Sequence, residues 1–423
     1  MKKRATKKTL PSAPEEIKLL SQGTYGCVYR RGVDCFGKKE LPQFITKIQK
    51  HKDNSERETE IGKKIMTIPH STSYFAPVLK SCPLVLAGID SDEISQCDFL
   101  KNKDFQNQSY ETNRIRYIGN LTYGDYLISC FKDHPSRFVL TFCELSKNIL
   151  ASLKKIAGKQ IVHFDIKENN ILIHERTRKP VIIDFGLSFD VGDLKSGHMD
   201  LVEAFYAHDG FEVSMWTIDI AFCCYIDKLR RNKGAWKDEV VTDAQIDEVI
   251  QNFFKYNPVF GEESRYQDAF TKEERNQYRT LHANMFRTEF SGKKWKDAIR
   301  VLLNYAFSWD NYALAVMNLS LLYELNLHTF PPLQPFVVFF KSILLKPCNE
   351  RPTCDITLDE FTRLLAGINN IGTPVVNKLR NLSRDSDFVA KQENNWKTSK
   401  LDNAKQEDKL YEKQGQDVPI LVQ

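Results

Sequence analysis

The stretch from residue 161 to residue 186 constrains the fold of this chain more than any other. Four polar side chains occur early in it with the spacing H-x-D-x-K-x-x-N, namely His163, Asp165, Lys167 and Asn170. Two apolar segments follow on either side of the polar run 175–180, and the second ends in Asp184-Phe-Gly. Apolar segments separated by a polar turn with proline are typical of a β-hairpin. Such a hairpin predicts that Asp165, Asn170 and Asp184 lie at one edge.

The residue types in this stretch match the needs of phosphoryl transfer. That reaction requires a base for the acceptor hydroxyl, oxygen ligands for Mg²⁺ and a cation against the phosphates. The stretch supplies each of these. Each motif alone is weak, because an isolated Asp-Phe-Gly is often an ordinary turn. The alternative interpretation, core strands with incidental polar residues, is disfavoured by the order and spacing of the motifs together.

This stretch resembles the catalytic loop and the metal-binding Asp-Phe-Gly of the eukaryotic-type protein kinases. The resemblance implies that Asp165 orients and deprotonates the substrate hydroxyl and that Lys167 contacts the transferred phosphate. It further implies that Asn170 binds one Mg²⁺ and that Asp184 binds the Mg²⁺ bridging the terminal phosphates of ATP. ATP and Mg²⁺ are therefore the expected cofactors.

A second part of the resemblance lies in residues 17–29, which predict a strand, a glycine turn and a strand. Gly23 and Gly26 match the later glycines of the kinase G-x-G-x-x-G-x-V loop, and Ser21 stands where the first is expected. A small residue can still make that turn, and backbone N–H groups within it can reach phosphates. Ordinary hairpins also contain this pattern, so alone it is a modest signal. The residues assigned to the nucleotide, the first and last covering adenine, are Leu20, Ser21, Gln22, Gly23, Thr24, Tyr25, Gly26, Cys27 and Val28.

A lysine and a glutamate downstream are expected to form an ion pair. The β-rich run 44–48 carries Lys47 in the style of the kinase V-A-I-K motif. A lysine on a buried strand costs desolvation energy unless it is paired. The helix-like segment 54–66 follows, and Glu58 lies on its apolar face. We therefore expect Glu58 to pair with Lys47 beside the nucleotide; the alternative is a solvent-exposed pair between Lys47 and another acid.

The segment after Asp-Phe-Gly departs from the kinase pattern. No A-P-E motif follows Asp184-Phe-Gly. The nearest candidate is the segment 211–220, in which Asp219 would take the place of the motif's acidic residue. Its expected partner is Arg351, which lies in a stretch that resembles the Arg-Pro-Thr near the end of the larger kinase lobe. Asp310 resembles the aspartate that hydrogen-bonds the backbone around His163. Ordinary buried helices are the alternative for both aspartates.

Phe164 replaces the arginine that many kinases use to bind an activation-loop phosphate. Because an apolar side chain cannot bind phosphate, we predict activity without phosphorylation of that loop.

The resemblance implies an α+β, two-lobed fold, with a small antiparallel sheet plus one helix as one lobe and a larger, mostly helical lobe. The connection between the lobes would hydrogen-bond adenine through its backbone. The expected parts are a basic disordered arm at 1–14, the first lobe at 15–119, the connection at 120–124, the second lobe at 125–370 with a helical insertion at about 222–307, and a polar charged tail at 371–423. The tail lacks the apolar area that ordering requires, so we expect it to be disordered, partly helical or docked by its last residues on a partner.

Composition excludes some classes of protein. The net charge of +5 is mild and concentrated at the ends, and the aromatic residues of the insertion favour core packing, so no direct nucleic-acid binding is expected. No apolar run is long enough to span a bilayer, and no secretory signal is visible. The ten cysteines include no CxxC pair, which favours reduced thiols in an intracellular compartment and disfavours zinc. Cys27 is a candidate reactive thiol.

The expected function is ATP- and Mg²⁺-dependent transfer of phosphate to Ser or Thr hydroxyls of protein substrates, because Lys167 resembles the serine/threonine pattern. The divergent region resembles kinases of large cytoplasmic DNA viruses, which implies a location in the host cytoplasm or in a virion.

Two alternatives to a protein kinase remain. One is a small-molecule phosphotransferase of aminoglycoside- or choline-kinase type, against which Lys167 and Asp184-Phe-Gly argue. The other is a catalytically dead, kinase-shaped binding module. The oligomeric state is not specified.

Overall fold

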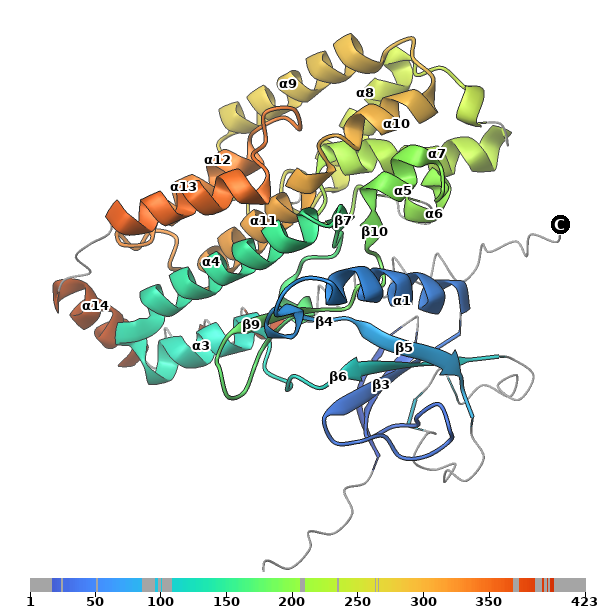
Figure 1. Ribbon diagram of the computed structural model, residues 1–423. Helices are drawn as coiled ribbons and strands as arrows, with labels where there is room; N and C mark the ends of the chain where they lie inside the picture. The colour runs from blue at the N-terminus through green and yellow to red at the C-terminus, as the bar shows by residue number, and fades with distance from the viewer. Residues whose placement is uncertain are drawn as a thin grey trace, which may run out of the picture. The chain divides into compact units, whose positions relative to one another are not determined.

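The computed structural model in Figure 1 divides into two units. Unit 1 comprises Met1–Thr59 and Val78–Tyr117, and unit 2 comprises Glu60–Pro77 and Ile118–Gln423. The residues that the structure describes are 17–23, 26–50, 52–85, 96–97, 100, 109–205, 210–233, 236–262, 264, 266–367, 373–384, 390–391, 394 and 396–398. The predicted basic arm at 1–14, the loop residues Thr24 and Tyr25, and most of the predicted tail lie outside them.

Unit 1 is built on an antiparallel sheet with the strand order β1-β2-β3-β6-β5. Its strands are β1 (Lys18–Gly23), β2 (Gly26–Arg30), β3 (Phe44–Gln49), β5 (Val78–Pro83) and β6 (Glu111–Arg116). Helix α1 (Lys52–Met66) follows β3. Its first half is grouped with unit 1, whereas its second half belongs to unit 2, because Ile61 and Ile65 are buried in the larger core of that unit. The predicted order of strand, glycine turn and strand is confirmed by β1 and β2.

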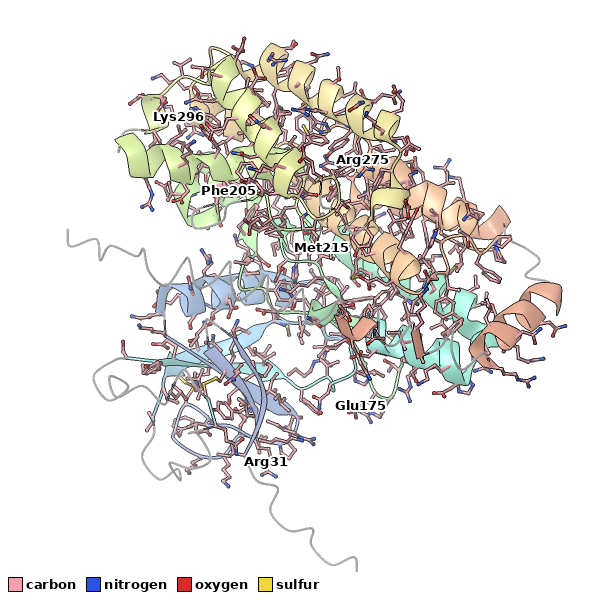
Figure 2. The ribbon with its side chains drawn as sticks, turned by 180° about the vertical axis from the view of Figure 1, so that it is seen from behind. Arg31, Glu175, Phe205, Met215, Arg275 and Lys296 are labelled. Carbon is pink, nitrogen blue, oxygen red and sulfur yellow. A yellow bond between two sulfur atoms is a disulfide. The ribbon has the colours of Figure 1, made fainter. Side chains whose placement is uncertain are left out.

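Two disulfide bonds crosslink unit 1, one of which is the yellow bond visible in Figure 2. They join Cys27 to Cys97 and Cys35 to Cys82. The prediction of reduced thiols is therefore wrong for these four cysteines, and Cys27 is not a free reactive thiol. The bonded cysteines are 70 and 47 residues apart, so no local spacing of cysteines in the sequence indicates that they pair. The cysteine pattern accordingly gives no support to a reducing compartment.

The core of unit 1 is small, and the first disulfide lies inside it. Cys27 and Cys97 are both fully buried among a few apolar side chains, which also include Tyr29 and Ile48. Small cores usually need such covalent links to reach useful stability. The six other cysteines are unpaired, buried and all in unit 2: Cys130, Cys143, Cys223, Cys224, Cys348 and Cys354.

Unit 2 is mostly helical. After the end of α1, its helices are α3 (Tyr123–Asp133), α4 (Phe138–Ala157), α5 (Val191–Ser196), α6 (Leu201–Phe205), α7 (Ile218–Lys233), α8 (Asp243–Tyr256), α9 (Lys272–Phe290), α10 (Trp295–Leu302), α11 (Trp309–Glu324), α12 (Gln334–Leu344), α13 (Cys354–Gly367) and α14 (Thr373–Arg384). Its 3₁₀ turns are η1 (Ser71–Ser73), η4 (Pro135–Arg137), η5 (Glu168–Asn170), η6 (Trp236–Asp238), η7 (Gln267–Ala269) and η8 (Ala306–Ser308).

Helix α11 forms the centre of unit 2. Nearly every side chain of its first four turns is buried, as expected of a helix surrounded by protein. It packs against α4, α12 and α13. None of the helices among the described residues is both long and apolar enough to cross a bilayer.

Helices α8, α9 and α10 lie in the predicted insertion at about 222–307, although α7 already begins before it and continues into it. Both α8 and α9 begin with capping boxes, formed by Thr242 with Gln245 and by Thr271 with Glu274. Figure 1 shows these helices gathered beside α7. Their aromatic residues are mostly buried, and the ring of Tyr266, also in the predicted insertion, lies 6.4 Å from that of Tyr323 on α11. The insertion is therefore part of the core of unit 2.

Short strands flank the residues of the H-x-D-x-K-x-x-N motif in unit 2. They are β4 (Phe75–Ala76), β7 (Ile161–Val162), β8 (Ile171–Ile173), β9 (Pro180–Ile183) and β10 (Phe189–Asp190). Strands β8 and β9 pair antiparallel, so the predicted hairpin is confirmed. Strand β4 pairs in parallel with β9, and β7 pairs antiparallel with β10. The loop between β7 and β8 and the turn between β9 and β10 therefore connect the same two small sheets, β7-β10 and β4-β9-β8.

Candidate functional site

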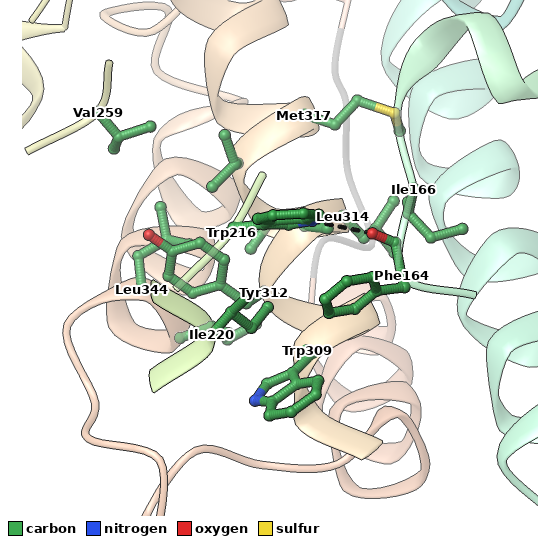
Figure 3. Close-up of a cluster of buried hydrophobic side chains, with 14 of the residues drawn as sticks. Phe164, Ile166, Trp216, Ile220, Val259, Trp309, Tyr312, Leu314, Met317 and Leu344 are labelled. Carbon is green, nitrogen blue, oxygen red and sulfur yellow. Dashed lines mark hydrogen bonds between the residues drawn. The ribbon is translucent and has the colours of Figure 1, made fainter. Parts of the chain in front are cut away.

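The backbone of the loop after β7 is strained and is held on both sides. Phe164 has a φ of +69°, in the left-handed region that non-glycine residues rarely adopt. Asp310 accepts hydrogen bonds from the N–H groups of His163 and Phe164, at 2.8 and 2.9 Å. The indole Nε1 of Trp216 donates to the Phe164 carbonyl at 2.9 Å (Figure 3). The contact predicted for Asp310 is confirmed. Burial raises the pKa of the Asp310 carboxyl, and His163 and the two N–H donors oppose that rise.

The Phe164 side chain lies in an aromatic cluster. Its ring centroid is 4.7 Å from that of Trp216 and 5.2 Å from that of Phe189. Phe205 and Trp309 complete the cluster, each 5.8 Å from Phe164, and Figure 3 shows Trp216 and Trp309 on either side of it. Phe189 and Phe205 come from the segment after Asp184-Phe-Gly. This segment is therefore attached to the loop by apolar contacts at the position where an arginine would bind phosphate.

Three of the predicted catalytic side chains meet in the loop. The Asn170 Nδ2 donates to the Asp165 carboxylate at 2.8 Å and to the Asp165 carbonyl at 2.9 Å. The Lys167 ammonium lies 3.1 Å from the same carboxylate oxygen. Asn170 is placed by the short η5 turn, and its N–H donates to the Lys167 carbonyl. The loop thus sets a carboxylate, an ammonium and an amide side by side.

Asp184 follows β9 and is held at its backbone by His163. The Nε2 of His163 lies 3.0 Å from the carbonyl of Ile183, and its ring centroid is 4.9 Å from that of Phe185. Asp184 has a φ of +57°, a second strained position. Its side chain is exposed, while Phe185 is buried against Phe75. His163 therefore fixes both neighbours of a carboxylate that faces outward.

In unit 1, Lys47 and Glu58 form the predicted ion pair. The Lys47 Nζ lies 2.8 Å from Glu58 Oε1, and the two side chains are only 14% and 2% exposed. The other Glu58 oxygen accepts from Asn113 Nδ2 at 3.3 Å and from Gln49 Nε2 at 3.5 Å. These two amides are site residues that the sequence analysis missed. Asn113 stands opposite Lys47 on the neighbouring strand, a pairing that only the strand register reveals.

The glycine hairpin of unit 1 approaches strand β3 closely. A Cβ on Gly26 would lie 1.8 Å from the Ile48 carbonyl oxygen, so only glycine is compatible with this backbone. Val28 stands opposite Lys47 in the sheet. Leu20 is half-buried, and Ser21 and Gln22 are exposed. The hairpin therefore leads to the strand that bears Lys47, while the turn residues assigned to phosphate lie outside the described residues.

The predicted pair of Asp219 and Arg351 is also confirmed, at 3.0 Å with both side chains fully buried. Trp309 Nε1 donates to the same carboxylate. Burial pushes the pKa of Asp219 upward, but the charge and hydrogen bonds of Arg351 outweigh burial and hold the pKa below its ordinary value. Both residues interact electrostatically with His282, which α9 of the insertion contributes. The ion pair is thus enclosed in part by the insertion.

Comparison with known proteins gives a partial match. No family model matches the chain. The chain is 31% identical over 143 residues to the probable serine/threonine-protein kinase mkcE of Dictyostelium discoideum. The match covers 30% of this chain and spans 19% of the length of that protein. This similarity indicates a protein kinase-like relationship over the matched part of the chain.

Proposed function

We propose that the protein is an ATP- and Mg²⁺-dependent kinase that transfers the terminal phosphate of ATP to Ser or Thr hydroxyls of proteins. The observation that carries the proposal is the Asp165 carboxylate, held by Asn170 and Lys167 in a loop whose strained backbone Asp310 fixes. Conformational strain of this kind persists only where the surroundings enforce it, and it concentrates at active sites.

Each residue of the loop has a chemical role in the proposed reaction. Asp165 accepts the proton of the acceptor hydroxyl, which makes the oxygen a better nucleophile. The ammonium of Lys167 stabilises negative charge on the phosphoryl group as it moves to the acceptor. The two N–H bonds of the Asn170 amide are directed to Asp165, so its carbonyl oxygen is the atom suited to a metal ion.

The donor atoms fit magnesium. An exposed carboxylate at Asp184 and an amide oxygen at Asn170 are hard oxygen ligands, and magnesium sites usually combine one or two such side chains with substrate phosphates. Bound Mg²⁺ would neutralise charge on the phosphates of ATP. In the proposal Lys47, kept in place by buried Glu58, contacts those phosphates as well.

A protein acceptor is favoured over a small molecule by two observations. The partial similarity is to a protein kinase, and Lys167 contacts Asp165 in the spacing of the protein kinase loop. A serine or threonine acceptor follows from the same lysine. A kinase-shaped binding module without activity would have no need for the polar cluster of the loop, although it would retain the Asp219–Arg351 pair.

Phosphate incorporation from radiolabelled ATP into a mixed protein substrate tests the proposal. We expect Asp165→Asn, Asp184→Asn and Lys47→Met each to lower incorporation by about 100-fold or more, the usual contribution of such groups. Exposed residues of the same types provide matched controls, Asp133→Asn in unit 2 and Lys18→Met in unit 1, which should retain activity. Incorporation that survives Asp165→Asn and Asp184→Asn unchanged would exclude the proposed chemistry. ATP binding without transfer to any acceptor would instead support the binding module.

A further inference from the structure

Trp396, from the carboxy-terminal tail, is buried against the start of helix α3. Only 6% of its surface is exposed, and its Nε1 donates to Asp125 Oδ1 at 3.1 Å. Its ring lies where Gly124 has no side chain, since a Cβ there would be 2.1 Å and 2.2 Å from two indole carbons. The same Cβ would lie 2.8 Å from Glu168 Oε2. Gly124, Asp125 and Glu168 thus line a recess, here named the Gly124 recess, that the indole fills.

The Gly124 recess adjoins the candidate catalytic loop. Glu168 is the first residue of η5 and directly follows Lys167, and α3 packs against η5. The chain reaches the recess after α14, which packs against η4 and α3 with Leu379 buried. Figure 1 shows α14 beside α3. The carboxy-terminal segment therefore contacts α3 twice, and its second contact lies next to the loop that bears Asp165.

The start of α3 is held without Trp396. Thr122 caps the helix, accepting from the Asp125 N–H and donating to Asp125 Oδ2 at 2.8 Å. The Tyr123 hydroxyl donates to Asn318 of α11 at 2.6 Å. These contacts hold the start of the helix independently of the indole. Trp396 is better described as a removable occupant of the recess than as a support.

The chemistry of the Gly124 recess defines its occupant. Gly124 gives room for a flat ring, Asp125 accepts a hydrogen bond, and Glu168 adds a second carboxylate at the rim. An aromatic side chain with an N–H or O–H donor satisfies the first two requirements. Two nearby carboxylates favour a segment of positive charge, and exposed Lys397 follows Trp396 directly.

We propose that the Gly124 recess is a docking site for an aromatic anchor carried by a basic protein segment, and that Trp396 occupies it in cis in competition with protein acceptors. The competition between Trp396 and protein acceptors rests on the proposed function. An acceptor that reaches Asp165 must approach the loop that contains Glu168, which also lines the recess. Docking itself does not depend on catalysis. The tail is thereby a built-in competitor of protein acceptors.

The docking part is tested by binding, which needs no activity. The probe is a fluorescent peptide of residues 390–402, and the proteins are full-length chains. We expect Trp396→Ala to bind the peptide at least about tenfold tighter than the native chain. In the native chain only the molecules whose recess is open can bind, so the apparent affinity falls in proportion to that fraction. Adding Gly124→Ala to Trp396→Ala should abolish binding, since the new Cβ fills the ring site. Alanine is also favoured over glycine in a helix, so folding should be retained.

The controls are a peptide with alanine in place of its tryptophan, which should not bind, and exposed Thr398→Ala in the chain, which should behave like the native protein. Equal affinity of the peptide for the native chain, Trp396→Ala and the double variant would overturn the docking proposal. So would tight binding of the control peptide.

The competitive part is tested by kinetics. We expect Trp396→Ala to lower the KM for a protein acceptor with the KM for ATP unchanged, whereas Gly124→Ala, in which the new Cβ fills the ring site, should not lower the acceptor KM. The peptide should inhibit Trp396→Ala in competition with the acceptor and not with ATP, and it should not inhibit the double variant. A raised acceptor KM or a lowered kcat in Trp396→Ala would overturn competition and show a supporting role. Peptide binding as expected, without phosphate transfer by any chain, would refute the proposed function and leave the docking site standing.

Discussion

Asp310 holds the backbone of the candidate loop, because its one buried carboxylate accepts hydrogen bonds from two consecutive backbone N–H groups at the strained turn. Strain at a residue such as Phe164 costs about 1–3 kcal/mol and must be compensated by contacts of this kind. The same carboxylate lies on α11, a helix of unit 2 whose first four turns are almost entirely buried. The geometry of the loop is therefore tied to the centre of the unit.

We predict that Asp310→Asn lowers the free energy of unfolding by about 2–3 kcal/mol, because hydrogen bonds to a charged acceptor are lost and an amide N–H₂ faces a backbone donor. Activity should fall with it. Urea unfolding followed by tryptophan fluorescence measures the first effect, and the exposed Asp133→Asn serves as the control. Unfolding curves that coincide for Asp310→Asn and the native chain would show that the loop is held by other contacts.

Phe164 gives a second prediction at this scale. Its ring is fixed by Phe189, Phe205 and two tryptophans, so the segment after Asp184-Phe-Gly is attached without any phosphate. We expect phosphatase treatment of the purified protein to change the rate of phosphate transfer by less than about tenfold, in contrast to kinases that order this segment through phosphorylation. Rates before and after treatment, with phosphorylation followed by mass spectrometry, provide the measurement. A larger loss would show that a phosphate contributes after all.

At the scale of elements, α9 connects the insertion to the buried ion pair. Its His282 is fully buried, with Nδ1 against the Tyr278 carbonyl at 2.9 Å. Burial lowers the pKa of His282 to about 4, from an ordinary value of 6.5. The histidine is therefore neutral in the folded protein down to acidic pH, whereas in the unfolded chain it takes up a proton near pH 6.5. Protons are then bound preferentially by the unfolded state.

It follows that folding stability should decline as the pH falls from about 6.5 to about 4, by up to about 3 kcal/mol from this residue alone. Unfolding free energies measured by urea titration across that range provide the test. His282→Gln removes the titrating group while keeping a polar side chain, so its stability should depend less steeply on pH over the same interval. Parallel curves for the two proteins would contradict the assignment to His282.

The sheet of unit 1 gives a prediction about reduction. The two disulfides close separations of 70 and 47 residues around a small core, and each such bond typically stabilises a domain by about 2–5 kcal/mol. We expect dithiothreitol to speed hydrogen exchange in β2 and β5 and to weaken ATP binding, with little change in α11 of unit 2. Cys27→Ser with Cys97→Ser should reproduce part of the effect in the absence of reductant. Exchange that is insensitive to reductant would show that the bonds are not needed.

For the whole molecule, the sequence was informative where a recognised motif supplied both partners of a contact. Glu58 could be assigned to Lys47, and Asp310 to the loop, because their places in the pattern are defined relative to the motifs. The hairpin of β8 and β9 followed from a local alternation of apolar runs and a turn. These contacts are confirmed, whereas the catalytic roles of the same residues remain proposals.

Other contacts could not be predicted, because their partners lie far apart in sequence within segments that carry no periodic signal. Cys97 lies in a polar run, and nothing local identifies Cys27 as its partner. Trp396 stands in a charged tail whose composition indicates disorder, yet one glycine on α3 provides space for its ring. Asn113 meets Glu58 only through the strand register of the sheet. In each case tertiary packing determined the contact.

The division of the cysteines between the two units has a practical consequence for biochemists. Sulfur is crosslinked in unit 1 and present as buried thiols in unit 2. A buffer with abundant thiol would reduce the crosslinks of unit 1, whereas unit 2 has no crosslink to lose. An inactive preparation in such a buffer would report on a loosened sheet and not on the chemistry of Asp165, so the proposed activity should first be tested on protein purified without reductant.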